Sequence, residues 1–217
     1  MMKKEPQQHL NPYTWTLKHI RNGGNRMVET DFILKALELK EQERAWIEMF
    51  QIEESESVAD HSWSVAFLSI LFSSEADINV EKVLKMVIVH DLAEAEIGDY
   101  ANRKKDEDRE ISSERKKQIE EDAWDRFDGM IDNEELKDLW REYERRETQE
   151  AKFVKDMDLL DLCLQALKYE RNDQYAREEI EFENLEGVFQ NSRERLQTEL
   201  GKQLFEKIYN RYESAEK

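Results

Sequence analysis

Two histidines in this sequence stand beside aspartates within strongly apolar segments. They are His61, which follows Asp60, and His90, which precedes Asp91. A carboxylate inside an apolar helix is costly unless it is paired with a cation or binds a metal. For Asp91 taken alone, the alternative is a residue at a helix end that meets water. The other two histidines lie within the first 19 residues, in a weakly patterned region, and we treat them as surface residues.

A third group of acids lies in the apolar segment AKFVKDMDLLDLCLQALKYE, which contains Asp156, Asp158 and Asp161. Asp158 stands between Met157 and Leu159, where a lone carboxylate again needs a partner. Asp161 follows Asp158 by about one helical turn, so the two side chains can share a helix face. Spacing alone does not choose among the three aspartates.

Imidazole nitrogen and carboxylate oxygen together favour a particular class of cation. They suit divalent Mn, Co, Ni, Zn or Fe, and Mg²⁺ is a further candidate. An octahedral ion held by a few such side chains keeps positions open for water. Because histidine must be neutral to bind a metal, we expect affinity to fall below about pH 6.

The elements that must position these residues are predicted to be helices. Both prolines precede residue 13, and Glu, Lys, Leu, Ala, Arg and Gln dominate the rest, so we expect an all-α fold. Residues 1–28 are expected to be loosely ordered, and Thr30 or Asp31 to cap the first helix. Of the predicted helices at 112–128, 133–146 and 149–171, we expect 149–171 to be the most amphipathic. The other predicted helices are a short one around 46–50, one at about 63–72, one at 80–93 capped by Asn79, and those at 112–128, 133–146 and 188–213.

Composition excludes several classes of protein. The net charge is −18 and no Lys/Arg-rich run occurs, which argues against a polymeric nucleic acid partner. A small phosphorylated ligand stays compatible, since a bound cation reverses the local field. No run of about 18 apolar residues predicts a membrane span. The single cysteine, Cys163, and the lack of an apolar signal core predict a cytoplasmic location.

Three strings of the sequence resemble one family. The order His61, His90-Asp91, Asp158 is similar to the H…HD…D signature of the HD superfamily. The strings ESVADHSW (56–63), VHDLAEAEIGD (89–99) and EAKFVKDMDLLDLCLQALKYE (150–170) resemble its compact 5′-deoxynucleotidase branch, which hydrolyses deoxynucleoside monophosphates. The similarity covers roughly residues 30–172. It implies a metal held by His61, His90, Asp91 and Asp158, with Asp156 at a position where the family often has Gln.

The resemblance also implies catalytic acids. Glu94 follows His90 by four residues, which we expect to be one turn along the same helix. In the resembled family this acid acts on the attacking water or on the leaving 5′-oxygen. Asp99 corresponds to a second family acid near the sugar and the leaving group. The alternatives are a surface helix residue for Glu94 and a simple turn residue for Asp99.

Substrate binding is implied for basic and aromatic residues. Arg44 and Trp46 resemble the family residues that clamp phosphate and pack against the sugar. Arg103 and Lys104, together with Lys105, are alternative phosphate ligands in a solvated loop at 100–109. Glu48 and Glu53 replace the usual basic residues after the Trp, and the segment between Trp46 and His61 is one residue longer than the family pattern.

The sequence and the resemblance together predict the number of metal ions, the domain organisation and the oligomeric state. Dinuclear HD enzymes use further histidines, and none follows His90, so we expect one metal ion. We expect a single all-α domain, an HD-type bundle of roughly eight helices with the metal between three core helices. Within it, the HD domain spans 29–172, and 173–217 is a C-terminal helical extension packed on it. The resemblance suggests a homodimer, although the sequence itself does not show one.

The predicted function is a metal-dependent phosphohydrolase acting on the 5′-phosphate of (deoxy)nucleoside monophosphates. One alternative is an HD hydrolase of another small phosphate ester or of a nucleotide polyphosphate. Another, from a different class, is a non-catalytic acidic helical interaction protein that kept the scaffold. The complete set of four ligands, with Glu94, favours the enzyme.

Overall fold

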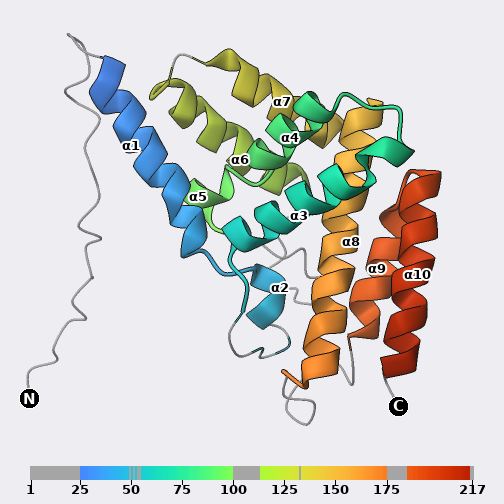
Figure 1. The fold of residues 1–217 in the computed structure, drawn as a ribbon. Helices are drawn as coiled ribbons and strands as arrows, with labels where there is room; N and C mark the ends of the chain where they lie inside the picture. Colours follow the sequence, from blue (N-terminus) through green and yellow to red (C-terminus); the bar gives the residue numbers. More distant parts are fainter. Residues whose placement is uncertain are drawn as a thin grey trace, which may run out of the picture.

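The fold is helical throughout the part of the chain that the computed structural model describes, which is residues 25–48, 50, 52, 55–99, 113–131, 133–174 and 185–215. These residues contain no strand, only an isolated bridge between Glu43 and Ser57. The elements (Figure 1) are α1 (Asn25–Leu37), η1 (Glu38–Lys40), α2 (Ala45–Glu48), α3 (Val58–Phe72), η2 (Ser73–Glu75), α4 (Val80–Val89), α5 (Glu94–Ile97), α6 (Ser113–Asp128), α7 (Glu134–Arg145), α8 (Gln149–Asn172), α9 (Glu186–Arg195) and α10 (Glu199–Ala215). Eight of these α-helices span ten residues or more, which confirms the all-α prediction.

Helix α8 is the central element of the bundle. It lies between α3, α4 and α7 on one side and α9 and α10 on the other (Figure 1). Every residue from 153 to 161 is buried, so this stretch is enclosed on all sides. The prediction that α8 is the most amphipathic helix is therefore wrong. Polar side chains in a helix that is buried all round must find their partners inside the protein.

Side chains cap the first turns of α3 and α4, the two helices that position His61 and His90. Ser57 caps α3, because its hydroxyl accepts from the Asp60 amide at 3.1 Å while the Asp60 carboxylate accepts from the Ser57 amide at 3.0 Å. The Asp60 carboxylate, although next to His61 in sequence, is therefore part of the helix cap. The predicted cap of α4 is confirmed, since the Asn79 side chain accepts from the Lys82 amide at 3.1 Å.

Three predicted helix boundaries are wrong. Helix α1 begins at Asn25, so Thr30 and Asp31 lie within it and do not cap it. Helix α4 ends at Val89 rather than at residue 93. The predicted helix at 188–213 is two helices, α9 and α10, separated at Leu196–Thr198.

The break between α9 and α10 has a tertiary cause. The Asp156 carboxylate, on α8, accepts from the Gln197 amide at 2.9 Å, the Thr198 amide at 2.7 Å and the Thr198 hydroxyl at 2.6 Å. The Thr198 hydroxyl in turn accepts from the Gly201 amide at 2.9 Å, which caps α10. A side chain 41 residues away thus binds the backbone donors at the start of α10.

The outward face of α3 carries four large apolar side chains, which we name the α3 apolar face. They are Trp63, Phe67, Ile70 and Leu71, and each is more than half exposed. Their spacing places them on one stripe of the helix, and the Trp63 and Phe67 rings stack with centroids 5.7 Å apart. None of the described helices is both long enough and apolar enough to cross a bilayer.

Candidate metal centre

His61 is oriented by an aspartate of the central helix. It is buried in α3, and its Nδ1 lies 2.7 Å from Oδ2 of Asp161. Because a carboxylate only accepts, Nδ1 donates in this bond. In the neutral imidazole, the Nε2 lone pair is then left to bind a cation.

His90 is oriented in the same sense by the backbone. It directly follows α4, is buried, and donates from Nδ1 to the Val87 carbonyl at 2.7 Å. Its Nε2 lies 3.4 Å from the Nε2 of His61. Two imidazole nitrogens that both lack a hydrogen gain nothing from facing each other, so this pair calls for a cation or a proton between its members.

Asp158 brings a carboxylate to the same point. Its Oδ1 lies 3.3 Å from His61 Nε2, and the ligand atoms of His61, His90 and Asp158 all lie within 4.8 Å of one another. A cation about 2.1 Å from each ligand separates neighbouring ligands by roughly 3.0–3.4 Å. The observed spacings fit one metal ion, held where α3, α4 and α8 meet.

Asp91 lies beside these three residues but outside the group that they form. Its Oδ2 is 3.3 Å from His90 Nε2 and 3.7 Å from His61 Nε2. The same oxygen accepts from Arg44 Nη1 at 2.9 Å. Of the four predicted ligands, three thus converge closely, and the fourth adjoins them while paired with an arginine.

The pKa shifts of His90, Asp91 and Asp158 favour the protonation states that bind a cation. Burial lowers the pKa of His90, which keeps it neutral. Burial alone raises the pKa of Asp158, but Lys155 and His61 outweigh it and pull the pKa well below its usual range. Burial likewise raises the pKa of Asp91, and His90 and Arg44 bring it down to about 2. Neutral imidazole and ionised carboxylate are the forms that bind a metal.

His61 behaves differently from His90. Burial and Arg44 lower its pKa, but hydrogen bonds to Asp158 and Asp161 outweigh them and raise it to about 9. A cation that binds at neutral pH must therefore displace a proton from His61.

The three aspartates of α8 have three different surroundings. Asp156 binds the start of α10, Asp161 orients His61, and Asp158 faces both histidines. Of these three α8 aspartates, Asp158 is the one with an oxygen near the histidine Nε2 atoms, which agrees with the ligand implied by the family resemblance.

Glu94 follows a tight turn and does not lie along α4. Since α4 ends at Val89, the prediction that Glu94 continues the His90 helix by one turn is wrong; Glu94 begins the short helix α5. It is buried, its Oε2 lacks a hydrogen-bond partner, and that oxygen lies 3.9 Å from Arg44 Nη1. Burial raises its pKa well above the usual value, and Asp91 adds to the effect.

Asp99 lies on the other side of Arg44. Its Oδ2 accepts from the Ala45 amide at 3.0 Å and lies 3.6 Å from Arg44 Nε. Gly98 precedes it with φ of 80°, a left-handed conformation that ends α5 and favours glycine. Arg44 is therefore bordered by carboxylates at 91, 94 and 99, and its buried Nε has no hydrogen-bond partner.

The other predicted substrate residues have mixed outcomes. Trp46 packs against Phe50 and Tyr169, with centroids 6.1 and 5.8 Å away, and its buried Nε1 lacks a hydrogen-bond partner. Arg103 and Lys104 lie outside the described residues, so their proposed role stays a prediction.

Sequence reasoning missed two residues that bind Asp158. Tyr143, on α7, donates to Asp158 Oδ2 at 2.7 Å, and Lys155 donates to the same oxygen at 2.5 Å. Lys155 had a usable signal, because it is a charged residue in a buried helix one turn before Asp158. Nothing in the sequence marks Tyr143, which reaches the site only because α7 packs on α8.

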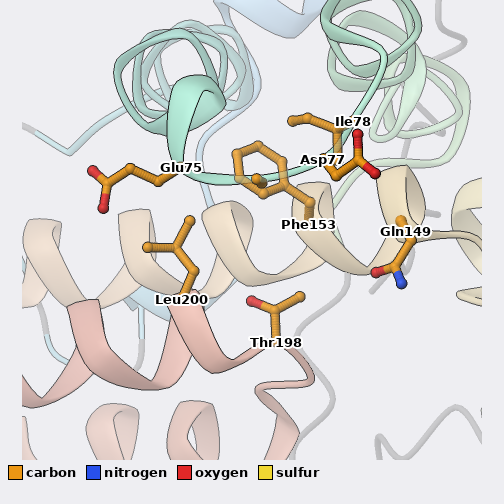
Figure 2. Close-up of a pocket in the computed structure, with 8 residues that line it drawn as sticks. Glu75, Asp77, Ile78, Gln149, Phe153, Thr198 and Leu200 are labelled. Carbon is orange, nitrogen blue, oxygen red and sulfur yellow. The ribbon is translucent and has the colours of Figure 1, made fainter.

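A separate pocket lies away from these residues, between the α3–α4 connection and the first turns of α8 and α10 (Figure 2). Phe153 and Leu200 supply apolar surface, as Figure 2 shows. The polar residues Glu75, Asp77 and Gln149 at its rim are exposed. This pocket lacks a buried polar group, so we assign it no ligand.

Comparison with known proteins agrees with the resemblance. The family model for the HD domain matches residues 36–200. The 5′-deoxynucleotidase HDDC2 of Xenopus laevis is 36% identical over 55% of this chain, and 5′-deoxynucleotidase hdd1 of Schizosaccharomyces pombe is 38% identical over 55%. The matched part spans only 58% and 61% of these two relatives. The crystal structure of the PH0347 protein from Pyrococcus horikoshii is 31% identical, with a TM-score of 0.65, and the match covers 85% of this chain and 98% of that one. The chain therefore belongs to the HD-domain family.

Proposed function

We propose that this chain is a metal-dependent phosphohydrolase that removes the 5′-phosphate from deoxynucleoside monophosphates. The observation that carries the proposal is the convergence of His61 Nε2, His90 Nε2 and Asp158 Oδ1 on one buried point. The names of the two 5′-deoxynucleotidase relatives support the substrate class.

In this proposal His61, His90, Asp91 and Asp158 hold one divalent ion; the candidates are Mn, Co, Ni, Zn and Fe, and Mg is a further possibility. A bound cation supplies Lewis-acid polarisation of a phosphoryl oxygen and acidifies water. The orphaned polar atoms of Arg44 and Glu94 support a ligand beside that ion, because buried polar groups are rarely left without a partner.

The surrounding residues divide the remaining chemistry. Hydrolysis forms a bond from a water oxygen to phosphorus and breaks the bond from phosphorus to the 5′-oxygen, which must gain a proton. Glu94, whose pKa is raised by burial, delivers that proton, and the attacking water releases one proton, which restores Glu94. Arg44 binds the phosphate, Asp99 fixes Arg44 and faces the sugar, and Trp46 packs against the nucleoside.

Phosphate release from a nucleotide panel tests the proposal. Protein stripped with EDTA is reloaded with Mn²⁺ or Co²⁺ and assayed on dAMP, dGMP, dCMP, TMP, AMP and dATP. We expect release from the deoxynucleoside monophosphates, and none after EDTA or in Asp158→Asn. The matched control is Asp60→Asn, which alters the exposed helix cap beside His61 and keeps activity. His90→Ala with full metal occupancy and unchanged activity would refute the site, and release from dATP alone would favour a polyphosphate hydrolase.

We also propose that the chain forms a homodimer through the α3 apolar face. Residues 62–72 contain no charge in a chain whose net charge is −18, so two copies meet there without like-charge repulsion. Light scattering should give a dimer that Trp63→Glu converts to a monomer; a monomeric wild type would end this proposal. The cytoplasmic location and the domain limits at 28 and 172 stay predictions.

A further inference from the structure

Besides facing the two histidines, Asp158 accepts hydrogen bonds from two buried residues that are not proposed ligands. Its Oδ2 accepts from Lys155 Nζ at 2.5 Å and from the Tyr143 hydroxyl at 2.7 Å, and Lys155 Nζ also lies 3.2 Å from that hydroxyl. All three residues are buried, and Lys155 precedes Asp158 by three residues on α8. The Tyr143 ring also packs edge-on against His90, with centroids 5.3 Å apart. The cluster therefore contacts two of the three converging ligands.

The two oxygens of Asp158 have separate partners. Oδ1 faces His61 Nε2 at 3.3 Å, whereas Oδ2 is taken by the two donors. A chelating carboxylate needs both oxygens on one cation, and a bridging carboxylate needs one oxygen on each of two. Either arrangement would have to break the bonds from Lys155 and Tyr143. The geometry therefore leaves one oxygen for one cation.

Lys155 also sets the charge of the site. An ionised carboxylate in a buried helix is costly without a compensating cation, and Lys155 supplies one within the same helix turn. When a divalent cation binds at Oδ1, it and the ammonium become like charges on opposite sides of one carboxylate, and they repel. Lys155 thus stabilises the metal-free protein and weakens the hold on the metal.

We propose that Lys155 and Tyr143 hold Asp158 so that it binds a metal through one oxygen only. Lys155 is also the internal counter-ion of Asp158: it stabilises the metal-free site and lowers its affinity for the metal. The inference rests on the proposed metal site and adds the control of its affinity and stoichiometry. Tyr143 acts by position and Lys155 acts mainly by charge, so the two residues affect metal binding in opposite directions.

Two substitutions separate these effects. Lys155→Met keeps the length of the side chain and removes the charge, while Tyr143 still holds Oδ2. Mn²⁺ affinity measured by calorimetry should rise at least about tenfold, the change expected even if the repulsion is screened as in water. Tyr143→Phe removes only the hydroxyl, and Mn²⁺ affinity should fall about tenfold, as for other residues that orient metal ligands. Lys152→Met, on the same helix, is the charge-matched control and should leave the affinity unchanged.

Thermal unfolding gives a second readout. Lys155→Met should lower the Tm of the EDTA-treated protein, and its rise in Tm on adding Mn²⁺ should exceed that of the wild type. A lysine with only a packing role would lower both Tm values equally and leave Mn²⁺ affinity unchanged, which overturns the proposal. Unchanged affinity in Tyr143→Phe, or two Mn²⁺ ions per wild-type chain, also overturns it. If the wild type binds no divalent ion, the proposed function is refuted as well. If it binds one ion but the variants behave otherwise than expected, only the proposal for Lys155 and Tyr143 is refuted.

Discussion

Asp156 and Gly201 form the joint between α8 and α10, and a double-mutant cycle on them tests how that joint works. Asp156 is fully buried, and its carboxylate accepts the three hydrogen bonds from residues 197 and 198. A Cβ added at Gly201 would lie 2.9 Å from the Asp156 Cβ and closer still to its carboxylate. Gly201→Ala must therefore push the carboxylate away from its donors.

The magnitudes follow from these contacts. A hydrogen bond to a charged group contributes about 1.5–3 kcal/mol. Burial raises the pKa of Asp156 despite its hydrogen bonds, so desolvation offsets part of their sum. We expect Asp156→Ala to lower the free energy of unfolding by about 2–4 kcal/mol, and Gly201→Ala to lower it by about 2 kcal/mol. Once Asp156 is alanine the contact with the carboxylate is gone, but the 2.9 Å contact with the Cβ of residue 156 remains. Gly201→Ala should therefore still destabilise this variant, but by less than it destabilises the wild type, because alanine is favoured over glycine within α10 by about 0.5–1 kcal/mol.

Urea unfolding of the wild type, both single variants and the double variant measures the cycle. The expected result is coupling between the two sites: Gly201→Ala destabilises the Asp156→Ala protein by less than it destabilises the wild type. Additive losses would refute the reasoning, because independent sites show no coupling. Mn²⁺ affinity should stay the same in all four folded proteins, since Asp156 is not a proposed ligand.

Three further predictions concern single side chains. Asp161→Asn should weaken Mn²⁺ binding about 10–100-fold in calorimetry, because the Nδ1 partner of His61 loses its charge; full affinity would show that Asp161 does not tune His61. Cys163 is buried with its pKa raised by burial to about 12, so a thiol reagent at pH 8 should label it only after unfolding, and rapid native labelling would contradict this. Burial raises the pKa of Glu120 to about 7, above its unfolded value, so its contribution to stability is present below about pH 4.5 and is lost as pH rises through 7. Glu120→Gln should therefore gain about 1–3 kcal/mol over the wild type at pH 8 and little at pH 5 in urea unfolding, and an equal gain at both pH values would reject the assignment.

The sequence predicts one helix start of this fold correctly, because that feature depends on residues close together in the chain. The cap at Asn79 follows from one side chain and an amide three residues later. The break at Leu196–Thr198 depends on a carboxylate 41 residues away, so no local pattern marks it. The end of α4 at Val89 is similar, since Leu92 and Ala93 are compatible with a helix that continues past His90 and Asp91.

The site shows the same division between local and tertiary information. Helical residues advance by about 100° each, so Asp158 and Asp161 lie about 60° apart, whereas Asp156 lies about 160° from Asp158. Spacing can therefore separate Asp156 from the other two, but it cannot rank Asp158 against Asp161. That choice depends on the ring of His61, whose Nδ1 meets Asp161 while its Nε2 meets Asp158. The two nitrogens of the His61 ring point in different directions. The ring position therefore decides both roles together: Asp158 as the proposed ligand and Asp161 as the residue that orients His61. The proposed metal site thus depends on how α3 packs on α8, and a shift between these helices would disturb both aspartates at once.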